Sequence, residues 1–67
     1  MAATDEMDAR VRAFLRREVV AARAEVVHEN VGGTYDDVIH ALRRLRMRGD
    51  VGTLPDGRWF YRGGVTR

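Results

Sequence analysis

The sequence lacks cysteine and lysine, has a single proline, and contains no apolar run as long as the roughly eighteen residues of a membrane-spanning helix. Without cysteine, no disulfide or thiolate-bound metal can support the fold, so the hydrophobic core or a dimer partner must do so. The first residues, Met-Ala-Ala-Thr-Asp-Glu, do not resemble a signal peptide. We therefore expect a cytoplasmic protein without membrane association.

The chain has 67 residues, which predicts one domain over residues 1–67 with its core within about residues 5–62. A domain of this size buries only about 60% of the surface that its unfolded chain exposes. A cleft large enough for a cofactor is not expected beside such a core, and neither is an enzyme. Hydrophobic residues make up 45% of the chain and charged residues 33%, which indicates a folded domain.

All twelve basic residues are arginine. Each guanidinium group is a planar fork that can bind phosphate or a guanine edge through two hydrogen bonds, although a GC-rich genome also favours arginine. Residues 1–37 hold eight acidic residues and five arginines, whereas residues 38–67 hold two acidic residues and seven arginines. The C-terminal half therefore carries the positive field that a nucleic-acid contact requires.

Apolar residues recur at helical spacing in three segments. Thr4 precedes an acidic first turn, which is typical of a helix start, so residues 1–4 are predicted to be a frayed end. The β-branched pair Val19-Val20 is a candidate short strand. The predicted helices run from after Thr4 to near Glu18, from Ala22 or Arg23 to Val31, and from about Tyr35 to Arg48.

The third predicted helix has recognisable ends. Gly32 is placed where the preceding helix would end in the left-handed conformation, and Thr34 is a suitable N-cap. Gly49 is the natural C-cap. We expect its exposed side to carry Arg43, Arg44, Arg46 and Arg48, and its buried side Val38, Ala41, Leu42 and Leu45.

The segments Val51–Leu54 and Arg58–Arg62 are predicted to form a hairpin around Pro55-Asp56-Gly57. Alternation places Trp59 and Tyr61 on one face and Phe60 on the other. These aromatic residues are expected to cover the core, with at least one of them, Phe60 or Tyr61, exposed for a contact. Val65 to Arg67 are predicted to be a loose tail.

Three helices followed by a hairpin is an α+β order that resembles the winged helix-turn-helix superfamily of bacterial and archaeal regulators, such as the GntR and MarR types. The segment from Val38 to Val51 is similar to their recognition helix and first wing strand. Val27, Val31, Gly32 and Val38 match the helix-turn-helix core spacing. The chain departs from the family pattern at His28, where members carry a small residue, and at Gly33, where the turn residue is usually apolar.

The resemblance implies binding of double-stranded DNA, with the third helix in the major groove and the wing on the backbone. The protein would then be a transcriptional regulator or a phage or plasmid accessory factor. Arg43 would bind a guanine edge, and Thr34 with the nearby amides would hold a phosphate. The implied DNA-contacting residues are Thr34, Tyr35, Ile39, His40, Arg43, Arg44, Met47, Arg58 and Arg62, and Asp36 is also expected to face the groove.

Other interpretations remain open. The helix arginines also fit a solvated face, and Asp36 and Asp37 oppose phosphate binding. The alternative is a winged helix that binds a protein partner through its wing aromatics or through Ile39 and Met47, the former as an exposed isoleucine. A homodimer is expected to form through the first helix, with Met7 and Phe14 as its surface.

Catalytic and metal sites are not expected. His28 and His40 lie on different predicted helices with no cysteine or carboxylate cluster nearby, whereas a zinc site needs three or four convergent ligands. Asp36 and Asp37 are sequential and diverge by about 100° on a helix, so they cannot share a proton. The glycine pairs lack the Gly-Lys-Ser/Thr ending of a phosphate loop. No cofactor is predicted.

Overall fold

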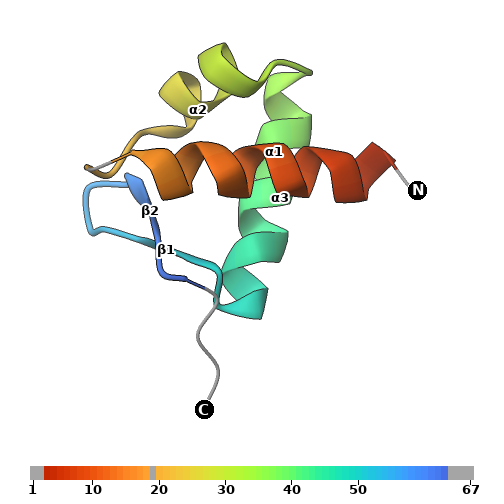
Figure 1. The fold of residues 1–67 in the computed structure, drawn as a ribbon. Helices are drawn as coiled ribbons and strands as arrows, with labels where there is room; N and C mark the ends of the chain where they lie inside the picture. Colours follow the sequence, from red (N-terminus) through yellow and green to blue (C-terminus); the bar gives the residue numbers. More distant parts are fainter. Residues whose placement is uncertain (1–2, 19, 64–67) are drawn as a thin grey trace.

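The computed structural model describes residues 3–18 and 20–63, which form a small α+β fold of three helices and a two-stranded antiparallel sheet (Figure 1). The first helix lies across the third, while the second helix and the hairpin lie toward opposite ends of the third helix. This order is compatible with a winged-helix layout. The elements are α1 (Ala3–Arg17), α2 (Ala24–Val31), α3 (Tyr35–Arg48), β1 (Val51–Thr53) and β2 (Trp59–Tyr61).

The first helix is slightly longer than predicted. It begins at Ala3, so Thr4 lies inside its first turn, and the predicted frayed start is wrong for these two residues. Asp5 lies in the first turn and Arg17 in the last, where each charge complements the helix dipole. Electrostatics at the ends thus favour the helix that the apolar spacing predicts. Residues 1–2 lie outside the described residues.

A short bridge ties the connection between α1 and α2 to the hairpin. Ala22 and Trp59 exchange two backbone hydrogen bonds, with N–O distances of 2.9 Å and 2.8 Å. The strand-like segment therefore falls at Ala22, and the predicted strand at Val20 is wrong, because that residue lies in a bend with 68% of its surface exposed. Val19 lies outside the described residues. The bridge also explains why α2 begins only at Ala24.

The third helix has the predicted bounds and caps. The Thr34 hydroxyl accepts a hydrogen bond from the Asp37 amide at 3.0 Å. Gly49 adopts the left-handed conformation, with φ 86° and ψ 7°. Gly32 has the expected positive φ of 82°, but its ψ of −164° makes the left-handed helical prediction wrong there. The next residue, Gly33, also has a positive φ, of 76°.

The core lies where α1, α2 and α3 meet the hairpin. The buried side of α3 is the predicted one, and Val27 of α2 is fully buried against it. Phe14 is only 4% exposed and Met7 packs against the core, so the two side chains expected to form a dimer surface point inward instead. The buried residues are Val11, Phe14, Leu15, Ala22, Ala24, Val27, Val38, Ala41, Leu42, Leu45 and Val51.

The hairpin is shorter than predicted, because Leu54 and Arg58 close the turn; the Leu54 amide donates to the Arg58 carbonyl at 2.8 Å. Trp59 and Tyr61 pack against the core, and Phe60 pairs with Gly52 on the opposite face. A Cβ atom at Gly52 would lie 2.7 Å from the Phe60 ring, so the ring covers this glycine. The expectation of an exposed aromatic is therefore wrong, since all three are half-buried.

The predicted tail over residues 65–67 lies outside the described residues. Among the helices that the structure describes, none is both long and apolar enough to cross a lipid bilayer.

Candidate nucleic-acid interface

The outward face of α3 carries four side chains at helical spacing. Asp36, His40, Arg43 and Met47 are separated by four, three and four positions, which places them on one side of the helix. All four are exposed, and Met47 is 90% exposed. This face is opposite the buried side of α3 and is therefore the surface that a binding partner would meet first.

Two arginines lie toward the C-terminal end of α3, Arg43 on the outward face and Arg46 beside it. Arg43, Arg46 and Met47 line one shallow depression. Within residues 3–18 and 20–63, neither arginine has an ion pair or a side-chain hydrogen bond. Their guanidinium groups therefore remain available to an anionic or hydrogen-bonding ligand.

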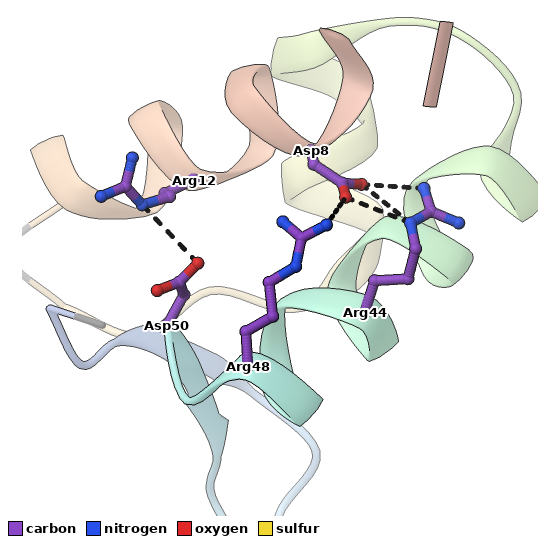
Figure 2. Close-up of polar contacts among 5 residues, drawn as sticks. All are labelled: Asp8, Arg12, Arg44, Arg48 and Asp50. Atoms are coloured by element: carbon purple, nitrogen blue, oxygen red, sulfur yellow. Dashed lines mark hydrogen bonds and ion pairs between the residues drawn. The ribbon is translucent and has the colours of Figure 1, made fainter. Parts of the chain in front are cut away.

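The side of α3 that faces α1 is different, as Figure 2 shows. The Asp8 carboxylate accepts hydrogen bonds from Arg44 Nη2 at 2.8 Å and from Arg44 Nε at 3.1 Å. Arg48 Nη2 lies 3.4 Å from the same carboxylate. The hydrogen bond to Asp8 raises the pKa of Arg44, and desolvation opposes this effect only in part. We call Asp8, Arg44 and Arg48 the α1–α3 ion cluster.

Arg44, one of the expected DNA-contacting residues, belongs to this ion cluster, and its guanidinium group is directed at α1 and hydrogen-bonded to Asp8. Sequence reasoning missed Asp8, which is only 3% exposed. One signal could have identified it. Asp8 precedes Val11 by three positions and Leu15 by seven, so it shares the buried face of α1. An acidic residue on that face needs a cationic partner, and the arginines of α3 are the nearest source.

A second ionic contact lies beside the cluster. Arg12 Nε is 3.8 Å from Asp50 Oδ2, where the end of α3 leads into β1 (Figure 2). The shallow hollow between α1 and this end of α3 is lined by both cations and carboxylates. Its mixed charge matches internal pairing of side chains better than recognition of an anionic ligand.

The N-terminal end of α3 is braced by His28. Its Nε2 lies 2.9 Å from the Gly33 carbonyl oxygen, so this nitrogen carries the proton that is donated. The His28 ring also meets the Tyr35 ring edge-on, with centroids 5.9 Å apart. The histidine that departs from the winged-helix pattern thus supports the turn between α2 and α3.

The other expected contact residues on this helix have different surroundings. Thr34 uses its hydroxyl as the cap acceptor but keeps its donor. Tyr35 is partly exposed, at 41%. Ile39 is half-buried against the core, so the expectation of an exposed isoleucine is wrong; it lies at the edge of the buried stripe, directly after Val38.

At the tip of the hairpin, Arg58 and Asp56 form an ion pair that neutralises both charges. Arg58 Nε donates to Asp56 Oδ2 at 2.8 Å, and the Arg58 amide donates to Asp56 Oδ1 at 3.2 Å. The backbone hydrogen bond is the main reason why the pKa of Asp56 is lowered, and the Arg58 side chain adds to the effect. The side chain of Arg62 is exposed and, in the described part of the chain, forms no ion pair.

Neither metal-site geometry nor similarity to known proteins assigns a function. Among the described residues, no three histidine, cysteine or carboxylate side chains are grouped so that they could hold a metal ion. No protein-family model matches the chain, and comparisons with curated proteins and with solved structures found no significant match. The function must therefore be inferred from the chemistry of the surface.

Proposed function

We propose that this protein binds double-stranded DNA as a winged helix-turn-helix module, with the outward face of α3 in the major groove. The observation that carries the proposal is the pair of arginines, Arg43 and Arg46, that share a depression with the exposed Met47. The major groove of B-DNA is about 12 Å wide and accepts a helix of this diameter. Its floor and edges offer acceptors and phosphates to which the guanidinium groups of Arg43 and Arg46 can donate hydrogen bonds.

The fold supports this proposal. The Ala22–Trp59 bridge ties the connection between α1 and α2 to the hairpin, so a wing formed by this hairpin would be fixed to the helices. The third helix is capped at both ends and is held on its inner side by the α1–α3 ion cluster. A recognition helix that is fixed before binding loses less conformational entropy when it meets DNA.

The structure allows roles to be distributed among the outward residues. Arg43, on the outward face, binds a guanine edge through two hydrogen bonds, while Arg46 and the hairpin residue Arg62 bind phosphates. Tyr35, His40 and the Thr34 hydroxyl, beside the free amides at the start of α3, supply further polar contacts. Arg58 contributes less than expected from the sequence because Asp56 neutralises it. Activity as a transcriptional regulator or as an accessory factor would follow from occupancy of a DNA site.

Fluorescence anisotropy of a labelled mixed-sequence duplex tests this proposal. Two to three neutralised phosphates give a log–log salt slope of about 2 to 3, so affinity should fall roughly 10- to 40-fold between about 50 and about 200 mM salt. Arg43→Ala should lower affinity further, by about 1–3 kcal/mol on a duplex that contains its preferred guanine. Arg16→Ala is the matched control, because it removes the same charge from an exposed position on α1.

The competing function is binding of a protein partner through the outward face of α3, where Met47 is exposed. The observation in its favour is the 90% exposure of this methionine on a helix face that also carries Asp36. The wing aromatics do not support it, because they are half-buried. An apolar protein contact changes little with salt, whereas phosphate contacts weaken steeply. Absence of duplex binding at the lower salt, with circular dichroism showing a folded protein, would exclude the DNA proposal.

A further inference from the structure

Met47 is the most exposed large hydrophobic side chain in the described part of the chain. It lies one helical turn after Arg43 on the outward face of α3, and the two side chains share a depression with Arg46. A thioether side chain is flexible and polarizable, so it adapts to small apolar groups. In the major groove, the small apolar group is the C5 methyl of a pyrimidine.

We infer that Arg43 and Met47 together select a base step in which a C5-methylated pyrimidine, thymine or 5-methylcytosine, is next to a guanine. This inference rests on the proposed DNA binding and specifies the DNA that is bound. Arg43 donates two hydrogen bonds to the guanine O6 and N7 atoms, and the Met47 side chain covers the neighbouring methyl group. Arg46, which lines the same depression, is placed to bind the adjacent phosphate.

The rise between the two residues lies between one and two base-pair steps. Four helical residues rise roughly 6 Å along the axis, and base pairs are about 3.4 Å apart. The long arginine and methionine side chains bridge the difference. His40, on the N-terminal side of Arg43, is polar, so the apolar contact lies only toward the C-terminal end of α3. This asymmetry gives the step a defined orientation along the helix.

Four short alternating duplexes test the inference, and none of them requires that the natural target site be identified first. The first alternates dT and dG, the second replaces every dT by dU, and the third and fourth alternate dC and dG without and with a 5-methyl group on dC. Loss of one buried methyl contact should lower affinity about fourfold. Met47→Gln should abolish the difference within each pair, and Met47→Leu should retain it. Because Met47 is exposed, both variants should stay folded.

The outcomes separate this inference from the proposal on which it rests. A methyl effect in either pair that disappears in Met47→Gln supports the inference, and the pair that shows it identifies thymine or 5-methylcytosine as the source. Equal affinities within both pairs, or a methyl effect that survives Met47→Gln, would overturn the inference while DNA binding stands. Failure to bind any of the four duplexes would overturn both.

Discussion

The two sides of α3 carry two arginines each, in entirely different surroundings. On the inner side, Arg44 and Arg48 converge on the buried carboxylate of Asp8. On the outer side, Arg43 and Arg46 line a depression with an exposed methionine, and among the described residues they form no ion pair. Half of the positive charge of this helix therefore fixes its position on α1, and the other half is available to a ligand.

The number of arginines on a helix does not by itself give the positive charge that the helix offers to a ligand. All four residues lie within six positions of one another and have the same chemistry. What separates them is a single carboxylate on another helix, 36 residues before Arg44 in the chain. The positive field of α3 is correspondingly weaker than the sequence predicts, because Asp8 cancels part of it.

Removing one arginine from each side of α3 tests whether the inner arginines stabilise the fold and the outer ones do not. Arg44→Ala should lower the free energy of unfolding by roughly 2–3 kcal/mol, because a buried carboxylate loses its main partner. The cost falls below that of a fully buried pair, since Arg48 still reaches Asp8 and Arg44 is itself partly exposed. Arg43→Ala should change stability by less than about 0.5 kcal/mol. Urea unfolding followed by circular dichroism measures both.

A control addresses the origin of this loss. In an Asp8→Ala background, Arg44→Ala should have almost no further effect, because the partner is already absent. If Arg44→Ala destabilises the protein equally with and without Asp8, its role is packing of the aliphatic stem, and the ion cluster is not what positions α3.

The inner side also contains a contact between α1 and the turn before α3. Gly33 has a φ of 76°, and a Cβ atom there would lie 2.6 Å from the terminal carbon of Met7. Gly33→Ala should therefore cost roughly 1–2 kcal/mol, from backbone strain and displacement of the methionine. A Met7→Ala background is the control, because it removes the atom that the new Cβ atom would meet.

Thermal unfolding distinguishes the two contributions. In the Met7→Ala background, Gly33→Ala should show the backbone cost alone, so the difference between its costs in the two backgrounds reports the contact with Met7. Equal costs in the two backgrounds would mean that the turn is not packed against α1 through this methionine.

Much of the fold is predictable from short-range chemistry. The bounds of α3, its Thr34 and Gly49 caps and its buried stripe all follow from residues within a few positions of one another. The Pro55-Asp56-Gly57 turn and the alternation of Trp59 and Tyr61 follow in the same way. Such features depend on local backbone preferences and on periodicity, which the sequence displays directly.

The errors concern contacts between distant segments. The strand-like bridge falls at Ala22 because Trp59 pairs with it, and no local pattern distinguishes that residue from its neighbours. Spacing alone groups Arg44 with Arg43, because the partner that separates them, Asp8, lies on another helix. Spacing likewise predicts Phe14 at a dimer surface, although this residue is part of the core. Packing between elements decides each of these cases, and periodicity within one element does not.

The smallest predicted effect extends the comparison to the wing, where Arg58 is neutralised by Asp56 and Arg62 is not paired among the described residues. Asp56→Asn should raise duplex affinity about two- to threefold, because it removes one negative charge and frees Arg58 for a phosphate. Asparagine keeps the acceptor for the Arg58 amide, so the turn should persist. Anisotropy titrations of Asp56→Asn and of Asp56→Asn with Arg58→Ala measure the effect, and most of the gain should disappear in the double variant.

The pKa of Asp56 provides an independent check on the same pair. A lowered pKa means that the carboxylate stabilises the folded state above its unfolded pKa, and that this contribution is lost as the pH falls through the folded pKa. Because the backbone amide of Arg58 is the largest cause, Arg58→Ala should raise the pKa only in part, as NMR titration of the carboxyl group can show. A return to the ordinary aspartate value in that variant would mean that the side-chain pair dominates. Arg58 would then be held more firmly by Asp56 than the geometry indicates. The contribution of the hairpin to the proposed DNA binding would be correspondingly smaller.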